Sequence, residues 1–300
     1  MVIVRRSFES ETPKLYICST PIGNLGDVSF RLLEILRSVD VVAAEDTRHT
    51  RKLLAKYDIH VPILVSYHQH NAESRADDFR QWWKEGKSIA VVSDAGTPCV
   101  SDPGEHAAAL AVGEGVPVVP IPGASAVLSA LVASGMQTQP FAFVGFLPRE
   151  HKKCTDELRR YREFPGVVVF YEAPHRLQKT VERIHEVFPN HRIVLAKELT
   201  KQHEAFIYGT SAEMLEYLKE DTPRGEYVII VDVRCSPMSD EAAGNAEPGT
   251  EADVLQAAMD HVRSLLAEGL SHTEAVKQVA KATGVRKREL YNATLAFVEE

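Results

Sequence analysis

Residues 93–104, SDAGTPCVSDPG, form the stretch that decides the fold. The apolar run at residues 88–92 precedes it and is predicted to be a buried strand, and the Ala-rich run at residues 105–112 follows it and is predicted to be a helix. The stretch is then a loop at the carboxyl end of a strand, where open α/β sheets bind their ligands. Its two glycines and two prolines remove side-chain bulk and fix φ, so the backbone can approach a ligand closely. The sequence therefore predicts a ligand-binding loop in an α/β protein.

A structural role competes with ligand binding for the same loop. Asp102 has the side chain of a helix N-cap, and Pro103 has the fixed φ that suits a first helical turn. Helix capping explains the second half of the loop, but it explains neither Asp94 nor the turn at residues 96–98. We therefore expect a capped helix and a binding loop together.

The chain length of 300 residues is typical of two domains of roughly 100 to 150 residues each, with an appendage. The pattern of strands and helices restarts after residues 135–140, which read as a domain linker. Strands after Arg192 follow one another with little predicted helix, so we expect the second sheet to be mixed. We place an N-terminal extension at residues 1–13, α/β domains at 14–136 and 137–234, an acidic linker at 235–253 and a helical domain at 254–300.

The helical domain is predicted to contain three helices, at residues 255–266, 273–283 and 287–298. The turn at residues 282–288 resembles a helix-turn-helix and is basic. Two interpretations remain open at this point. The domain either binds nucleic acid, or packs on the body of the protein or on a partner.

Composition excludes several classes of protein. The net charge of −8 argues against a protein that coats nucleic acid, although it allows a local basic surface. No apolar run reaches the ~18 residues of a membrane helix, and residues 1–14 contain no signal-peptide core, so we expect a cytoplasmic protein. The four cysteines lack C-x-x-C spacing, and His68 and His70 lack a nearby third ligand, so we predict no metal site.

Several other predicted strands end in polar, glycine-rich or charged loops. The loop at residues 20–27 follows a strand at 14–19, but its G-x-x-G spacing does not match a dinucleotide fingerprint. Its following helix, at about residues 29–38, is expected to direct Phe30, Leu33 and Leu36 into the core. The cluster at residues 45–51 either caps a helix through Asp46 or Thr47, or faces a substrate with arginines that bind phosphate.

Six motifs together resemble one protein family. They are TPIGNLGD at residues 20–27, AEDTR at 44–48, SDAGTPCVSDPG at 93–104, PGASA at 122–126, YEAPHR at 171–176 and KELTK at 197–201. In this order they are similar to the tetrapyrrole methylase superfamily, and within it to the branch that methylates ribose in bacterial 16S ribosomal RNA. The resemblance spans residues 14–233. It implies two α/β domains with S-adenosylmethionine in the cleft between them, a homodimer, and methyl transfer to the 2′-hydroxyl of a decoding-region cytidine in the small ribosomal subunit.

The resemblance also implies which residues bind the cofactor. They are Pro21, Ile22 and Gly23 in the first loop, Asp94, Ala95, Gly96 and Thr97 in the second, Ser125 and Ala126 in the third, and Tyr171, Pro223 and Gly225 in the second domain. Members that act on tetrapyrroles usually carry a Gly-Asp-Pro triplet where this chain has residues 93–96, which favours RNA as the substrate.

Chemistry adds candidates for catalysis and for RNA binding. Methyl transfer is a direct displacement, so alignment matters most, and a general base eases loss of the ribose proton. The candidate bases are Lys197, Glu198, Glu45 and His203, of which we favour the Lys197 and Glu198 pair. The candidate phosphate-binding residues are Arg48, Arg51, Arg149, Arg176 and Lys287.

Two other functions compete with this interpretation. One is a methyltransferase for a tetrapyrrole or another small molecule. The other is a DNA-binding regulator that reads its operator with residues 255–300 and uses the rest of the chain as a sensor. The regulator is disfavoured because the helical domain carries one weak turn motif, whereas six ligand-loop motifs precede it.

Overall fold

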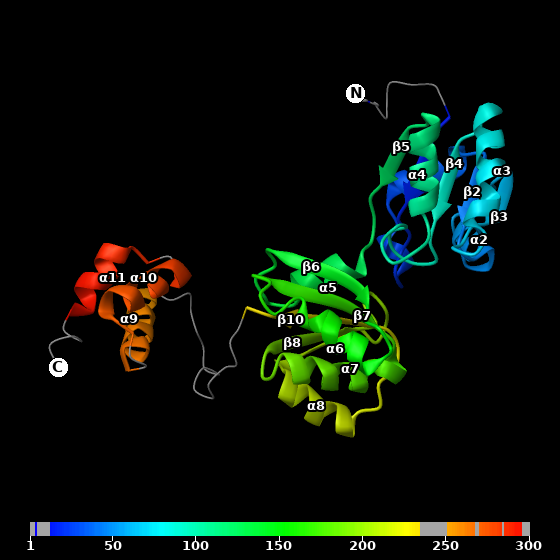
Figure 1. The fold of residues 1–300 in the computed structure, drawn as a ribbon. Helices are drawn as coiled ribbons and strands as arrows, with labels where there is room; N and C mark the ends of the chain where they lie inside the picture. Colours follow the sequence, from blue (N-terminus) through cyan, green and yellow to red (C-terminus); the bar gives the residue numbers. More distant parts are fainter. Residues whose placement is uncertain (1–3, 5–12, 235–250, 268–269, 284, 296–300) are drawn as a thin grey trace. The chain divides into compact units, whose positions relative to one another are not determined.

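The computed structural model describes residues 4, 13–234, 251–267, 270–283 and 285–295. The chain divides into two compact units, Met1–Pro237 and Met238–Glu300. In the described residues, the first unit contains two five-stranded sheets with their helices, and the second contains three helices (Figure 1). Within the described ranges, no helix combines the length and the hydrophobicity that crossing a membrane requires.

The first sheet consists of five parallel strands in the order β3-β2-β4-β1-β5. These are β1 (Leu15–Cys18), β2 (Val41–Ala44), β3 (Ile63–Ser66), β4 (Ile89–Val92) and β5 (Val118–Ile121). Helices α1 (Phe30–Ser38) and α2 (Thr47–Lys56) pack on one face, and α3 (Ala72–Lys84) and α4 (Glu105–Glu114) pack on the other. Successive side chains along a strand point to opposite faces, so each strand contributes to both cores. Burial on both faces explains the apolar runs of β2 and β4.

The neighbouring strands β1 and β4 are where the chain changes direction across this sheet. From β1 the chain passes through α1 to β2, and from β4 it passes through α4 to β5 on the other side of β1. Because α1 and α4 cover opposite faces, the loops after β1 and β4 diverge. Such a topological switch point is where open α/β sheets bind ligands.

The second sheet has the order β6-β7-β10-β8-β9. Its strands are β6 (Phe141–Phe146), β7 (Val167–Glu172), β8 (Arg192–Lys197), β9 (Ala205–Thr210) and β10 (Tyr227–Asp232). Only the β6 and β7 pair is parallel, so the predicted mixed sheet is confirmed. Helices α6 (His151–Arg159), α7 (Pro174–Val187) and α8 (Ser211–Glu220) pack on one face, and α5 (Ala126–Ala133) packs on the other (Figure 1).

The second unit contains α9 (Glu251–Ala267), α10 (His272–Thr283) and α11 (Lys287–Ala293). Buried residues from all three helices, including Ala258, Val276 and Leu290, form its core. The three predicted helices are therefore present. Residues 235–250 of the predicted acidic linker, and residues 296–298 of the predicted last helix, lie outside the described residues.

The predicted fold class is confirmed, but several details of the prediction were wrong. Strand β3 and helix α8 were not predicted, although Thr210 and Glu213 form a capping box at the start of α8. Phe30 was predicted to enter the core, but it is 88% exposed, because Leu32, Leu33 and Leu36 form the buried face of α1. Of the two candidate caps of α2, Asp46 is the cap, and its side chain accepts a hydrogen bond from the Arg48 backbone.

Candidate functional site

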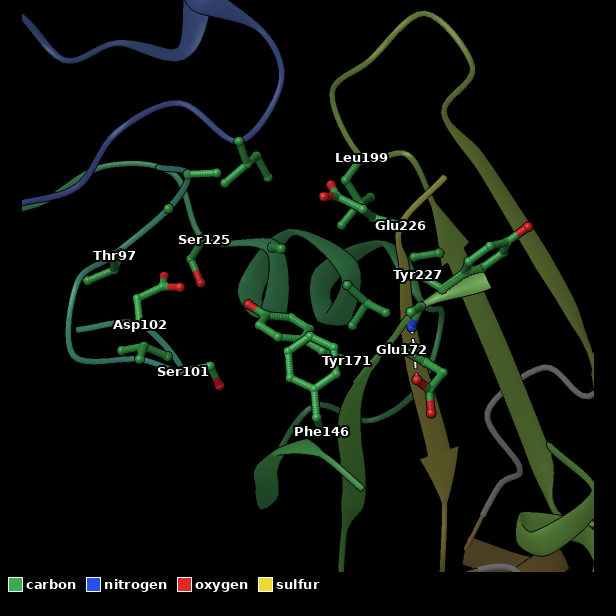
Figure 2. A pocket seen from close by; sticks show the side chains of 18 of the residues that line it. Thr97, Ser101, Asp102, Ser125, Phe146, Tyr171, Glu172, Leu199, Glu226 and Tyr227 are labelled. Carbon is green, nitrogen blue, oxygen red and sulfur yellow. Dashed lines mark hydrogen bonds between the residues drawn. The ribbon is translucent and has the colours of Figure 1, made fainter. Parts of the chain in front are cut away.

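A cavity of about 470 Å³ lies between loops of the first sheet and strands of the second (Figure 2). This volume is within the range of small-molecule sites in proteins. The first sheet contributes residues that follow β1, β4 and β5, and these are Ile22, Ala95, Gly96, Thr97, Val100, Ser101, Asp102, Ser125 and Ala126. The second sheet contributes Phe146, Tyr171, Glu172, Ala173, Pro174, Ala196, Leu199, Glu226, Tyr227 and Val228.

Hydrogen bonds join the three loops of the first wall to one another. The backbones of Thr20 and Gly96 exchange two hydrogen bonds, of 2.8 and 3.1 Å, which form an isolated bridge between the loops after β1 and β4. The Ser19 and Thr97 hydroxyl oxygens lie 2.9 Å apart, and the Thr97 hydroxyl donates to the Ala124 carbonyl at 3.3 Å. The loops therefore form one rigid surface, which is what alignment of a ligand requires.

The loop at residues 93–104 contains an unfavourable backbone conformation. Cys99 and Ser101 have φ angles of 70° and 66°, in the left-handed region that non-glycine residues avoid. Such conformations cost roughly 1 to 3 kcal/mol each and persist only where their surroundings impose them. Gly104 is part of those surroundings, because a Cβ atom there would lie 2.6 Å from Cys99 Sγ. A loop of this kind at a switch point is typical of a ligand site.

Asp102 faces the cavity instead of capping a helix (Figure 2). Helix α4 begins at Glu105, its N-cap position is Gly104, and no side chain in the described part of the chain caps it. The predicted cap was wrong, because the left-handed residues of the loop turn Asp102 into the cavity wall. Burial, followed by repulsion from Glu45 and Asp94, raises the pKa of Asp102 to about 7. Sequence reasoning did not select this carboxylate as a site residue.

The second wall is mostly apolar and aromatic, although Glu172 and Glu226 also belong to it. The rings of Phe146 and Tyr171 lie edge to face with centroids 5.7 Å apart, and Val228 and Tyr227 come from the adjacent strand β10. Burial, followed by the nearby Asp102 carboxylate, raises the pKa of Tyr171 to about 12. Tyr171 therefore stays uncharged near neutral pH and presents a flat apolar surface beside one carboxylate.

Glu172 is fully buried at the end of β7, and its partners hold the start of α7. It accepts hydrogen bonds from the Ala173 backbone at 2.8 Å and from the Thr180 hydroxyl at 2.5 Å. Arg176 Nε lies 3.2 Å from its carboxylate, and another Arg176 nitrogen donates to the Leu147 carbonyl at 2.6 Å. Arg176 was a predicted ligand of RNA phosphate, but these bonds already engage its guanidinium group with Glu172 and with the Leu147 carbonyl.

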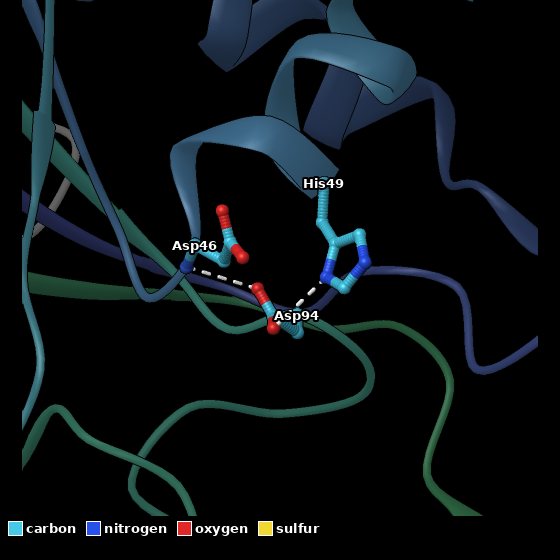
Figure 3. Close-up of side chains that lie close together, drawn as sticks. All are labelled: Asp46, His49 and Asp94. Carbon is cyan, nitrogen blue, oxygen red and sulfur yellow. Dashed lines mark hydrogen bonds and ion pairs between the residues drawn. The ribbon is translucent and has the colours of Figure 1, made fainter.

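Charged residues that follow β2 form a cluster with Asp94, which follows β4 (Figure 3). The Asp94 carboxylate accepts from the Asp46 backbone at 3.0 Å and lies 3.0 Å from His49 Nδ1, while the Asp94 backbone donates to Glu45 at 3.2 Å. Arg48 forms an ion pair of 2.6 Å with Asp46 and lowers the pKa of that carboxyl. The Asp46, His49 and Asp94 ligand atoms lie within 4.8 Å of one another, the spacing that a metal ion needs. Their hydrogen bonds account for this geometry, so we assign the cluster to holding the loop at residues 93–104 against α2.

The structure brings only some of the predicted site residues to the cavity. Those that line it are Ile22, Ala95, Gly96, Thr97, Ser125, Ala126 and Tyr171. Pro21, Gly23, Asp94, Pro223 and Gly225 lie in the same loops or turns but do not line it. Sequence reasoning missed the other lining residues, among them Asp102, Phe146, Leu199, Glu226, Tyr227 and Val228.

The candidate bases occupy different surroundings. Lys197 Nζ lies 5.9 Å from the ring centroid of Tyr227, which lines the cavity. Glu198 accepts hydrogen bonds from Lys201 and from the Glu226 backbone, both at 2.9 Å, and the bond from Lys201 is the main reason that the pKa of Glu198 is lowered. Glu45 belongs to the cluster around Asp94, and His203 is exposed in the loop after β8.

The remaining candidates for RNA binding lie on the surface. Arg51 on α2 and Arg149 after β6 are exposed, and neither forms a hydrogen bond or ion pair with the part of the chain that the structure describes. Lys287 is exposed in the first turn of α11, in the second unit.

Comparison with known proteins gives consistent results over nearly the whole chain. Ribosomal RNA small subunit methyltransferase I of Bacillus subtilis (strain 168) is 43% identical over 287 residues, which cover 95% of each protein. The protein of the same name from Halalkalibacterium halodurans is 41% identical, covering 96% of this chain and 97% of that protein. Among solved structures, uroporphyrin-III C-methyltransferase from Thermus thermophilus complexed with S-adenyl homocysteine has a TM-score of 0.52 at 17% identity, covering 73% of this chain and 98% of that chain.

Two family matches account for both units. Residues 253–297 match the family described as RsmI C-terminal HTH domain. Residues 14–215, which contain the cavity loops of both sheets up to Leu199, match the family described as Tetrapyrrole (Corrin/Porphyrin) Methylases. With this match and with relatives above 40% identity along its length, the chain belongs to the tetrapyrrole methylase family.

Proposed function

We propose that this protein is an S-adenosylmethionine-dependent methyltransferase of 16S ribosomal RNA, and that it methylates the ribose 2′-hydroxyl of a cytidine in the decoding region. The observation that carries the proposal is the cavity at the switch point, where the Asp102 carboxylate lies in a largely apolar wall that also contains Glu172 and Glu226. The names of the relatives support small-subunit ribosomal RNA as the substrate, and a structural neighbour has been crystallised with S-adenyl homocysteine.

The residues of the cavity fit this cofactor. When bound, S-adenosylmethionine supplies an activated methyl group on a sulfonium. We propose that backbone groups of Ala95, Gly96 and Ser125 hold its polar part and that Tyr171 and Val228 cover its adenine. The Asp102 carboxylate would pair with its positive charge, a role that sequence reasoning did not foresee. The cofactor has no phosphate, so the wall needs no lysine-bearing phosphate loop.

We propose Lys197 as the residue that orients the ribose hydroxyl or, as the neutral amine, receives its proton. Lys197 is preferred over Glu198 because Glu198 is already engaged by Lys201 and by the Glu226 backbone. Replacement of Lys197 by Met should lower kcat for methyl transfer while the affinity for S-adenosylmethionine stays at the wild-type value. If the affinity for S-adenosylmethionine fell by the same factor as kcat, Lys197 would instead belong to the cofactor site.

We propose that RNA phosphates bind at Arg51 and Arg149 and at the basic end of the helical unit, which contains Lys287. Arg48 and Arg176 are less suited, because each is already paired with a carboxylate. A small-subunit substrate also implies a cytoplasmic protein.

We further propose a homodimer. Leu128 and Val132, one turn apart on α5, are 52% and 76% exposed, and Tyr208, whose hydroxyl donates to the Ala133 carbonyl, is 58% exposed. This apolar surface is suited to a second copy of the chain. Light scattering that reports a monomer at micromolar concentration would refute the dimer.

We also propose domain boundaries at residues 14–136, 137–234 and 254–300. Limited proteolysis can test these boundaries.

Incubation of the purified protein with small subunits or with a porphyrinoid, each with radiolabelled S-adenosylmethionine, tests the proposed substrate. We expect label in small-subunit RNA and none in the porphyrinoid. Label in the porphyrinoid alone would support the competing small-molecule methyltransferase.

A further inference from the structure

We propose that Lys201 is a positioning residue that ties the two walls of the cavity together and thereby sets how tightly the cavity holds its cofactor. The inference rests on the proposed cofactor site. Lys201 does not line the cavity. It ends the KELTK motif, but it is not among the residues that we predicted from the sequence to bind cofactor, catalyse methyl transfer or bind RNA.

The alkyl stem of Lys201 reaches the first wall at Gly23. A Cβ atom built on Gly23 would lie 2.5 Å from Lys201 Cγ, 3.0 Å from Thr200 Oγ1 and 3.2 Å from the Leu199 carbonyl oxygen. Only glycine allows so close an approach. Ile22, the neighbour of Gly23, lines the cavity on one side, and Leu199 lines it on the other, so the contact lies at the seam between the walls.

The ammonium group of Lys201 bridges two carboxylates of the second wall. Its Nζ lies 2.9 Å from Glu198 Oε1 and 2.8 Å from Glu226 Oε2. Glu198 and Glu226 also exchange backbone and side-chain hydrogen bonds, each of 2.9 Å. Because the Glu226 carboxylate is 80% exposed, its pair with Lys201 is worth little alone, whereas Glu198 is 20% exposed. The bond from Lys201 to Glu198 therefore contributes more to the stability of this loop than the bond to Glu226.

The loop that Lys201 holds has a conformation that needs support. Glu198 and Thr200 have φ angles of 50° and 65°, in the left-handed region that non-glycine residues avoid. The Glu198 side chain covers Gly225 so closely that a Cβ atom there would lie 2.4 Å from Glu198 Cδ. Loss of the bridge should let this loop relax, which would move Leu199 and Glu226 in the cavity wall.

Two variants separate the stem of Lys201 from its charge. Lys201→Met keeps most of the stem and removes the ammonium group, and Lys201→Arg keeps the charge. In calorimetric titrations, we expect Lys201→Met to weaken binding of S-adenosylmethionine by about tenfold, the size of one lost charge-assisted hydrogen bond. Lys201→Arg should bind close to the wild-type value. Lys219→Met, which breaks an exposed ion pair with Glu216 on α8, is the matched control and should leave binding unchanged.

A double variant tests the contact with Gly23 independently. Gly23→Ala should weaken binding, because its new methyl group collides with the Lys201 stem. Lys201→Ala removes that stem, so Gly23→Ala with Lys201→Ala should bind better than Gly23→Ala alone. The proposal would be overturned if the double variant lost affinity by the product of the two single-variant losses. It would also be overturned if Lys201→Met bound S-adenosylmethionine as tightly as the wild type. Failure of the wild-type protein itself to bind S-adenosylmethionine would refute the proposed function and this inference with it.

Discussion

Replacement of Asp102 by Asn should weaken cofactor binding and, at the same time, stabilise the unliganded protein. The carboxylate lines the cavity and its pKa is raised to about 7, first by burial and then by Glu45 and Asp94. In the unliganded protein its charge is therefore unfavourable, and Asn removes that charge. In the complex the charge has a cationic partner, and its loss should weaken binding by about 1.5 to 3 kcal/mol, on the order of ten- to a hundredfold.

The pH dependence of the two effects follows from the raised pKa. A carboxyl whose folded pKa lies above its unfolded value makes the fold less stable as pH rises from about 4 through about 7. The stabilising effect of Asn should therefore be present at about pH 8 and absent at about pH 4. Only the ionised carboxylate attracts the cofactor, so wild-type affinity should rise about tenfold between about pH 6 and pH 8, and Asp102→Asn should lose that rise.

Calorimetric titration with S-adenosylmethionine and thermal melting across this pH range measure both effects. Asp77→Asn is the matched control, since the Asp77 side chain is 92% exposed on α3. The reasoning is refuted if Asp102→Asn binds the cofactor as tightly as the wild type, or if its melting temperature falls at about pH 8.

Three further predictions test the fold and the proposed RNA contact. Leu36→Ala should lower the free energy of unfolding by about 2 to 5 kcal/mol, because Leu36 is buried. Phe30→Ser should change it by less than about 0.5 kcal/mol, because Phe30 is exposed. Chemical denaturation measures both values, and similar losses in the two variants would refute the observed buried face of α1. Thr210→Ala should cost about 1 kcal/mol in the same assay through loss of the cap of α8, and an unchanged midpoint would contradict that role. Arg51→Ala and Lys287→Ala should each reduce the salt dependence of RNA binding by about one ion, as fluorescence titrations at several salt concentrations would show; unchanged slopes would remove both residues from the interface.

The sequence was informative about the first wall because each of its loops follows a strand and precedes a helix. The strand at residues 88–92 and the following glycines were enough to predict that Gly96 and Thr97 would lie at a ligand site. Asp102 was misassigned because an Asp-Pro pair before a helix is a good cap signal, and left-handed backbone at Cys99 and Ser101 cannot be predicted from residue types that rarely adopt it.

The second wall was harder to predict because it depends on contacts between distant parts of the chain. Strand β10 lies between β7 and β8, so Tyr227 and Val228 reach the cavity through pairings that no local pattern specifies. Helix α8 was missed although its capping box was visible in the sequence. The pairing of Arg48 with Asp46, two residues away, was also a local feature that could have been anticipated.

Transfer of a deuterated methyl group tests the central claim most directly. The purified protein would be incubated with S-adenosylmethionine carrying a trideuterated methyl group and with small ribosomal subunits from cells that lack this protein, and the RNA would be mapped by mass spectrometry. We predict one trideuterated methyl group on a cytidine ribose in the decoding region of 16S ribosomal RNA. Deuterium on a base, at another site or nowhere in the RNA would contradict the account.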